Sequence, residues 1–590
     1  MKNTSYSIML LAISCSMFLS SCSEDFLDKP AFGSLNDQVL ADEKGVNALL
    51  IGTYGALGGT TDYAALGGGN PWEATPSNWI YGDITGGDAH KRSDGGDQPA
   101  INSIATYSEA ASNGFFNTKW KALYEGVTRA NNVLRALAQV EEIGEADRAN
   151  ISCQARFLRG HYYFELKKMY NMVPWVDETT ENTNVPNDID IWPNIAADFK
   201  YAYDNLPATQ SGVGRANKWA AGAYLGKTYL YMGKNPEAKS VFTEVINSGV
   251  TSNGLGYGLV ENFNHNFNAE FENNKESVFA IQMVANDGTN TIGNANTSLM
   301  LNYPYNSPFR CCGFYQPTQD LVNAFRTDQS GLPFLNDYNS NPVKSDQGIL
   351  SSDPFTPDTQ SLDPRLDWTV GRRDVPYHDW GYHPGYNWIR EQSSGGAYAP
   401  KKHIYWQYHA DVYADQSSWA PGNAINVNVI RFADVLLLAA EAEAHEGGLT
   451  QALTYVNQVR ARMADNPEFW LKDYINPEEP LSGFSDEFAA NYNLSTDPDG
   501  SFSSEEFAMD AIMFERRVEL AMEGHRFFDL VRWGVAEEVL NDYVQYEGQI
   551  TTDIRGASFT QNDRYFPIPQ RQIDLSTTAE GPVLKQNPGY

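Results

Sequence analysis

Cysteine is scarce in this chain, with only five among 590 residues. Cys15 and Cys22 lie near the N-terminus, which leaves Cys153, Cys311 and Cys312 for the rest of the protein. Three cysteines do not make a disulfide framework, and no metal-ligand spacing surrounds them. Cys311 and Cys312 could close a vicinal disulfide, but the sequence favours two separate thiols. We therefore predict no metal and no other cofactor.

A hydrophobic run long enough to span a membrane is also missing near the N-terminus. The apolar stretch from Ile8 to Leu19 is interrupted by small polar residues and is shorter than the roughly 20 residues that cross a bilayer. It is typical of a signal peptide, and the following Leu19-Ser20-Ser21-Cys22 looks like a bacterial lipobox. We predict a signal peptide over residues 1–21, a lipid on Cys22 and a tether over 22–35, rather than an ordinary cleavage site. The membrane would then be contacted through the lipid only.

Positive charge is in short supply. Forty-two Lys and Arg face 74 Asp and Glu, so the net charge is −32. Such a surface repels phosphate backbones and anionic lipid faces. This balance excludes nucleic acid as the expected partner.

Sequence signatures of common catalytic sites are absent. The chain has no G-x-S-x-G elbow and no H-E-x-x-H motif, and Gly222 and Gly226 are one residue too close for a phosphate-binding loop. A glycoside hydrolase needs two carboxylates about 5–10 Å apart, but 74 acids make such pairs uninformative. We therefore expect a protein that is not an enzyme.

Helical periodicity is present at both ends of the chain. "WKALYEGVTRANNVLRALAQV" and "ARFLRGHYYFELKKMY" place apolar residues at helical spacing, and Pro174 should end the second helix. "LGKTYLYMGKNPEAKSVFTEVI" has the small and aromatic positions of a tetratricopeptide repeat, and residues 430–464 form a second copy. In a further helix, Arg516 with Glu519 and Glu523 with Arg526 are spaced as i, i+3 ion pairs.

The middle of the chain has a different composition. "ESVFAIQMV" is expected to be a short strand, whereas most of residues 250–427 carry Tyr and Trp among Gly, Pro and Asn. Loops this long inside a compact protein are usually functional.

Several blocks of the chain resemble the SusD/RagB family of surface glycan-binding lipoproteins. They include "WKALYEGVTRANN", "GFYQPTQDLVNAF", "IRFADVLLLAAEA", "ERRVELAMEGHRFFDLVRWG" and the ending "FPIPQRQIDL…LKQNPGY", in the order usual for the family. The resemblance implies a mainly α structure, with a tetratricopeptide-like helical-repeat scaffold, long irregular loops and a few short strands. We expect one SusD-like domain over 36–590, its scaffold mainly at 36–250 and 428–540 and its ligand-binding loops at about 60–115 and 250–427.

The resemblance also implies a function. Members of the family bind oligosaccharide or polysaccharide at the cell surface and deliver it to a SusC-like TonB-dependent outer-membrane transporter. A location on the outer membrane, anchored by lipid and facing the exterior, follows from the same resemblance. The alternatives are a peptide- or protein-binding surface lipoprotein for nutrient uptake or, less in keeping with the sequence, a surface glycoside hydrolase.

Candidate ligand contacts are chosen by chemistry, because the family has no fixed ligand motif. Aromatic faces stack on sugar rings, while carboxylates, amides and Arg bond the hydroxyls. Any of the aromatic side chains could instead be a buried loop anchor. The acids could instead bind backbone amides in Asx turns. The predicted contacts are Asn70, Trp72, Trp79, Asp83, Asp88, Tyr303, Tyr305, Arg373, Trp380, Tyr382 and Trp388.

One segment has the spacing of a calcium loop. "STDPDGSFSSEE", from Ser495 to Glu506, has acids at several of the required positions, but Ser495 replaces the first Asp and Pro498 is unusual there. The sequence favours a surface turn without a metal.

Overall fold

The structure is a computed structural model of the whole chain and describes residues 42–182, 184–289, 291–497 and 502–590. The predicted signal peptide, Cys22 and the tether lie outside the described residues, as does the centre of the calcium-like segment. Over the described ranges, no helix is both long and apolar enough to cross a membrane.

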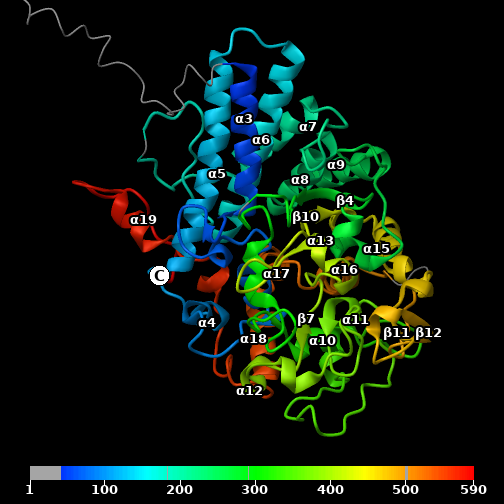
Figure 1. Cartoon of the computed structure of the whole chain (residues 1–590). Coiled ribbons are helices and arrows are strands. Elements are labelled where there is room, and N and C mark those ends of the chain that lie inside the picture. The colour runs from blue at the N-terminus through cyan, green and yellow to red at the C-terminus, as the bar shows by residue number, and fades with distance from the viewer. Residues whose placement is uncertain (1–41, 183, 290, 498–501) are drawn as a thin grey trace, which may run out of the picture.

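The N-terminal part is a series of helices in which α5 to α9 each pack against the next (Figure 1). The predicted helix stop is confirmed, since α6 ends at Tyr170, just before Pro174. The helices are α3 (Glu43–Gly55), α4 (Pro99–Ala105), α5 (Gly114–Gln139), α6 (Glu145–Tyr170), α7 (Trp192–Asn205), α8 (Lys218–Tyr231) and α9 (Asn235–Ser248).

The repeat prediction is confirmed by the packing of α8. A Cβ added to Gly226 would lie only 2.7 Å from the Phe242 ring of α9, and one added to Gly222 would lie 2.8 Å from the Tyr203 ring of α7. Only glycine at these positions lets the three helices approach so closely. The fold is accordingly mainly α and built on tetratricopeptide-like helix pairs.

A second group of helices follows the loop region, and its first member α14 packs against α9. The two parts of the scaffold therefore join into one body (Figure 1). The helices are α14 (Phe432–His445), α15 (Leu449–Ala464), α16 (Glu505–Leu520), α17 (Arg526–Trp533), α18 (Ala536–Glu547) and α19 (Gln570–Leu575).

The loop region between the two groups starts and ends at one small sheet. The predicted strand is confirmed as β4 (Ser277–Ile281), which pairs antiparallel with β10 (Val427–Arg431). Between them lie the short helices α10 (Gln319–Ala324), α11 (Leu366–Thr369), α12 (Gln392–Gly395) and α13 (Ala410–Tyr413). The remaining strands are β1 (Thr60–Thr61), β2 (Ala64–Ala65), β3 (Ala89–His90), β5 (Gln316–Pro317), β6 (Val370–Gly371), β7 (Ala399–Pro400), β8 (Ala414–Asp415), β9 (Gly422–Asn423), β11 (Lys472–Tyr474), β12 (Phe484–Phe488), β13 (Thr577–Thr578) and β14 (Gly581–Pro582).

The charged residues in the C-terminal half of α16 are buried and do not form the predicted i, i+3 pairs. Glu519 is fully buried and accepts hydrogen bonds from Arg365, Arg431 and Arg462. Arg516 pairs with acids of α14 and α17 instead of Glu519. Glu523 lies beyond the end of α16 and pairs with basic residues of the loop region. The spacing prediction was wrong because these side chains point into the protein.

Burial by itself would raise the pKa of Glu519, but the three surrounding guanidinium groups hold it well below its usual value. The carboxylate therefore stays ionised. It joins the loop region (Arg365), β10 (Arg431) and α15 (Arg462) to α16. This arrangement is called the Glu519 network below.

Replacing the central carboxylate should destabilise the whole fold. We expect Glu519→Ala to lower the free energy of unfolding by about 3–5 kcal/mol or more, because three buried guanidinium groups would lose their common partner. The measurement is urea unfolding followed by circular dichroism. The control is Lys200→Ala, which removes an exposed pair with Asp204 and should change stability by less than about 0.5 kcal/mol. Equal effects of the two variants would contradict this account.

Candidate functional site

Three of the predicted ligand contacts, from the N-terminal part of the chain, are buried and form hydrogen bonds inside the protein. Trp79 is fully buried, and its indole Nε1 donates to the carbonyl of Ser298 at 3.2 Å. Asp83 accepts the Tyr315 hydroxyl and the Gly524 amide, and Asp88 accepts from Arg517 Nε at 2.9 Å. These bonds tie the turn at 79–88 to the loop region and to the C-terminal helices.

Burial raises the pKa of both acids. It raises the pKa of Asp83 well above its usual value, with the nearby charge of Asp88 adding to the shift. A carboxyl group held this way in the interior is unsuited to binding sugar hydroxyls at the surface.

Tyr303 and Arg373 are also closed off from ligand. Tyr303 stacks on Phe309 with ring centroids 5.2 Å apart, and its hydroxyl accepts from Asn423. Arg373 donates to backbone carbonyls of residues 350, 351 and 353. The assignment of Trp79, Asp83, Asp88, Tyr303 and Arg373 to a ligand surface is corrected by their burial.

Three further predicted aromatics are half-buried. Trp380 donates from Nε1 to the carbonyl of Tyr405 at 2.8 Å. Trp388 packs edge-on against Tyr377, with centroids 5.5 Å apart. The Tyr382 hydroxyl donates to Asp473 of β11, whereas Trp380 and Trp388 pack against a different group of residues. Trp380, Trp388 and Cys311 all pack against the same hydrophobic cluster. The two tryptophans therefore support, from one side, the surface around Cys311 that is described next.

Tyr305 stands at the centre of the most promising surface. Its side chain is 38% exposed, and the Arg390 guanidinium lies 5.2 Å from its ring centroid. Gly313 has a positive φ of 81° and lies against both residues, since an added Cβ would come within 3.1 Å of the Tyr305 Cβ and 3.6 Å of the Arg390 Cβ. A side chain at position 313 would crowd Tyr305 and would be strained by the positive φ.

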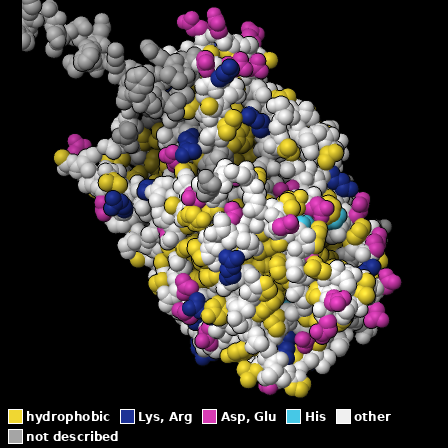
Figure 2. Space-filling view, viewed as in Figure 1, with side chains coloured by type: hydrophobic (Ala, Val, Ile, Leu, Met, Phe, Trp, Pro, Cys, Tyr) yellow, Lys and Arg dark blue, Asp and Glu magenta, His cyan; other side chains and the backbone are white. Residues whose placement is uncertain are grey.

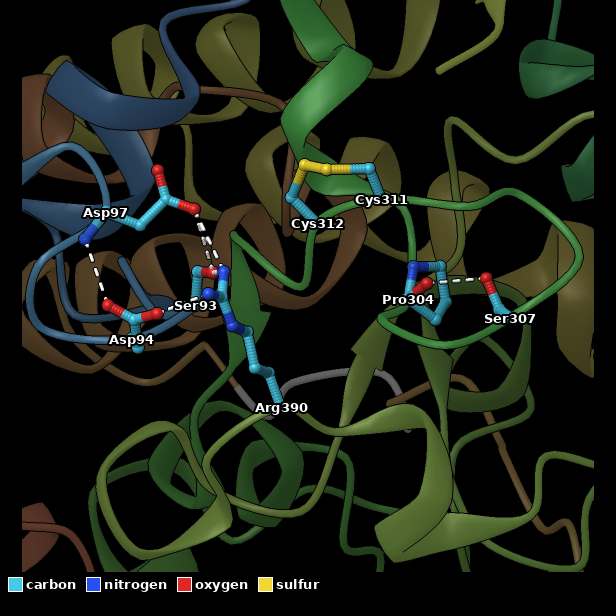
Figure 3. Close-up of a disulfide and its surroundings, with 8 residues drawn as sticks. All are labelled: Ser93, Asp94, Asp97, Pro304, Ser307, Cys311, Cys312 and Arg390. Atoms are coloured by element: carbon cyan, nitrogen blue, oxygen red, sulfur yellow. Dashed lines mark hydrogen bonds and ion pairs between the residues drawn. A yellow bond between two sulfur atoms is a disulfide. The ribbon is translucent and has the colours of Figure 1, made fainter. Parts of the chain in front are cut away.

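Two acids and a disulfide complete the centre of this surface. Arg390 pairs with Asp94 and with Asp97, the latter at 3.0 Å. Figure 3 shows the Arg390 side chain extending toward Ser93, Asp94 and Asp97, with the disulfide nearby. Cys311 and Cys312 are joined in that disulfide, which corrects the expectation of two thiols.

Asp94 remains a strong hydrogen-bond acceptor. The Gly96 amide donates to its carboxylate at 2.8 Å, and this bond together with the charge of Arg390 lowers the pKa of Asp94. An ionised carboxylate beside an arginine can accept from one ligand hydroxyl while the arginine donates to another.

Trp419 extends the surface and was missed by the sequence analysis. Its side chain is 47% exposed and meets Trp72 edge-to-face, with centroids 6.3 Å apart. Arg310, next to the disulfide, donates to the carbonyl of Ser418 at 2.8 Å and so holds the Trp419 loop. The segment "DQSSWAPG" has the same mixture of Trp with Ser, Pro and Gly that led to the other choices. We call Tyr305, Arg390, Asp94, Asp97, the disulfide, Trp419 and Trp72 the Tyr305 surface.

Trp72 and Asn70 are the remaining predicted contacts. Trp72 is buried, with its Nε1 donating to Gln98 and its ring packed on Trp419. Asn70 is exposed, but its side chain bonds Glu73 at the start of a short 3₁₀ turn. Both lie on the same loop. Trp72 therefore belongs to the candidate surface only as the support of Trp419, while Asn70 serves the local turn.

Among the residues that the structure describes, no group of three or more His, Cys, Asp or Glu is placed to hold an ion. Glu506 of the calcium-like segment lies in the first turn of α16. The loop that would complete that site falls partly at 498–501, outside the described ranges.

Comparison with known proteins places the chain in a family. A sequence profile described as "SusD family" matches residues 275–590, and one described as "Starch-binding associating with outer membrane" matches residues 81–230. The first match covers more than half of the chain. The chain belongs to the SusD family. This membership confirms the resemblance seen in the sequence.

SusD-like relatives cover most of the chain at low identity. A SusD-like protein of Bacteroides ovatus is 23% identical over 517 residues, which is 80% of either chain. A SusD superfamily protein of Bacteroides vulgatus has a TM-score of 0.66 at 22% identity, covering 93% of this chain and 99% of its own. Surface glycan-binding protein A of Bacteroides thetaiotaomicron, in complex with laminarihexaose, has a TM-score of 0.61 at 20% identity, covering 92% and 99%. These structures share the SusD fold with this chain.

The buried His90 and its two acidic partners should make the stability of the fold depend on pH. His90 lies just before the loop of Asp94 and contacts Glu547 at 2.9 Å and Asp553 at 3.1 Å. Burial alone would lower the pKa of His90, but the two carboxylates outweigh it and raise the pKa to about 10. The stabilisation is complete below the unfolded pKa of about 6.5 and is lost as the pH rises toward the folded value.

We therefore expect His90→Gln to flatten the loss of unfolding free energy between about pH 6.5 and 10. Urea unfolding at several pH values measures this, with His445→Gln as the control because His445 pairs with Glu505 at the surface. The account fails if wild type and His90→Gln lose stability in parallel.

Proposed function

We propose that this protein binds oligosaccharide or polysaccharide at the cell surface without cleaving it. The observation that carries the proposal is the Tyr305 surface, where exposed aromatic rings stand beside two acids and an arginine. Aromatic faces suit the C–H face of a pyranose, and the charged groups can bond its hydroxyls. Membership of the SusD family and the laminarihexaose complex of a relative with the same fold support the same ligand class.

Hydrolysis is the less suitable function for this surface. A glycosidase requires a carboxylic acid that stays protonated, which means a raised pKa. Asp94 has a lowered pKa instead, and Arg390 pairs with both acids of the surface. This pairing favours binding over acid catalysis.

The protein would act as a lipid-anchored component of an uptake system. Cys22 would carry the lipid, residues 22–35 would form the tether, and a single domain over 36–590 would face the exterior. A SusC-like TonB-dependent transporter in the outer membrane would receive the glycan. The net charge of −32 fits a neutral ligand better than an anionic one.

Substitution of the exposed rings tests the proposal. Affinity electrophoresis against plant, microbial and host polysaccharides should identify a ligand for the wild type, without release of reducing ends. Tyr305→Ala and Trp419→Ala should each weaken that binding by about tenfold or more, because contact with one aromatic side chain contributes about 1.5–3 kcal/mol.

Tyr201→Ala is the matched control for these substitutions. Tyr201 is also an exposed tyrosine beneath an arginine, 4.4 Å from the Arg156 guanidinium, but it lies on α7. Release of reducing ends by the wild type would overturn the non-catalytic proposal. Retention by no polysaccharide, together with binding to a peptide library, would favour a peptide-binding protein.

A further inference from the structure

A second aromatic pocket lies outside the Tyr305 surface. It has a volume of about 280 Å³ and is lined by Trp368, Trp406, Tyr408, Trp470, Phe484 and Asn264, among others. None of these residues belongs to the Tyr305 surface. We propose that this aromatic pocket is a second carbohydrate site, which binds a short neutral stretch of the same polysaccharide. The inference rests on the proposed function, because it assigns the same ligand class to a second place.

The rings of the pocket are fixed by the protein before any ligand arrives. The Nε1 atoms of Trp368, Trp406 and Trp470 donate to Phe469, Asn264 and Met463 at 3.1, 3.1 and 2.7 Å. These N–H groups are therefore already used, and a ligand meets the apolar parts of the rings. A preformed apolar platform of this kind suits the C–H face of a sugar.

A buried amide holds the Trp406 ring from behind. Asn264 is only 2% exposed, its Oδ1 accepts from Trp406, and its Nδ2 is shielded from solvent. Asn264 therefore acts on a ligand through the ring that it positions. The polar groups that a ligand can reach belong to the half-buried Asn262 and the exposed Tyr408, and sugar hydroxyls can bond to both.

The walls of the pocket favour an uncharged ligand. Asn262, Asn264 and Asn268 supply neutral amides, and burial lowers the pKa of the lining His265, which stays uncharged at neutral pH. The charged lining groups are Glu468, which is exposed, and Lys472, which is half-buried. No described wall carries an arginine that could clamp a carboxylate or phosphate. Amides and rings together therefore point to a neutral polyhydroxylated ligand.

The two sites lie on opposite sides of one short segment. Tyr405 packs under the Tyr305 surface, where it meets Trp380 and Phe309 with centroids 5.8 and 5.4 Å apart. The next residue, Trp406, lines the aromatic pocket. One long polysaccharide that reached both sites would be held more tightly than by either alone.

The test removes the two sites separately. Isothermal titration of the full-length protein uses laminarihexaose, cellohexaose, maltohexaose and mannohexaose as probes. In the Tyr305→Ala/Trp419→Ala background, one probe should still bind, and adding Tyr408→Ala should weaken that binding at least tenfold. Tyr408 is 52% exposed, so its removal should leave the fold intact. Trp406→Ala serves as a second, stronger variant, and Tyr201→Ala as the control.

Three results would overturn the inference. Loss of all probe binding in the Tyr305→Ala/Trp419→Ala background would mean that the protein has one site only. The proposed function would still be supported in that case. Unchanged residual binding after Tyr408→Ala and Trp406→Ala, with both variants folded, would place the second site elsewhere. Failure of the wild type to bind any of the four probes would count against the pocket as a carbohydrate site, while retention of polysaccharides in electrophoresis would still support the proposed function.

Discussion

The Glu519 network is the interaction on which the rest of the structure depends. A carboxylate without water is stable only if its charge is balanced, and here three guanidinium groups from different parts of the chain balance it. Hydrophobic packing alone would hold the helices together, but it is not directional. The charged contacts specify where the loop region lies on the helices, and so which loops come together at the surface.

The same need to balance buried charge explains the positions of several other acids. Asp83, Asp88 and Glu547 lie inside and accept hydrogen bonds from the backbone, arginine and histidine. Acids that appear in glycine-rich loops therefore serve two different purposes. Asp88 fixes the beginning of a loop to α16, whereas Asp94, six residues later, is left at the surface beside Arg390.

The helices could be predicted from the sequence because their signals are local. Apolar spacing identified α5 and α6, and the repeat positions Gly226 and Phe242 identified the close contact of α8 with α9. The partner of a buried charge could not be predicted, because it depends on segments far apart in the chain. Glu519, for instance, meets a residue 154 positions away instead of a helix neighbour. For the same reason, composition could not separate Trp79, which is buried, from Trp419, which is exposed.

The pairing of β4 with β10 has a consequence for how such a protein diversifies. The chain leaves the scaffold at Ile281 and returns at Val427, and these two residues are direct neighbours on the ladder. The residues between them form one long loop region whose two ends are held together by the β4–β10 ladder. Because the entropic cost of closing a loop grows only slowly with its length, a longer loop region would add little to that cost. Segments inside it can be exchanged or resized while the helices keep their positions. The helical scaffold and most of the Tyr305 surface can therefore change at independent rates over evolution.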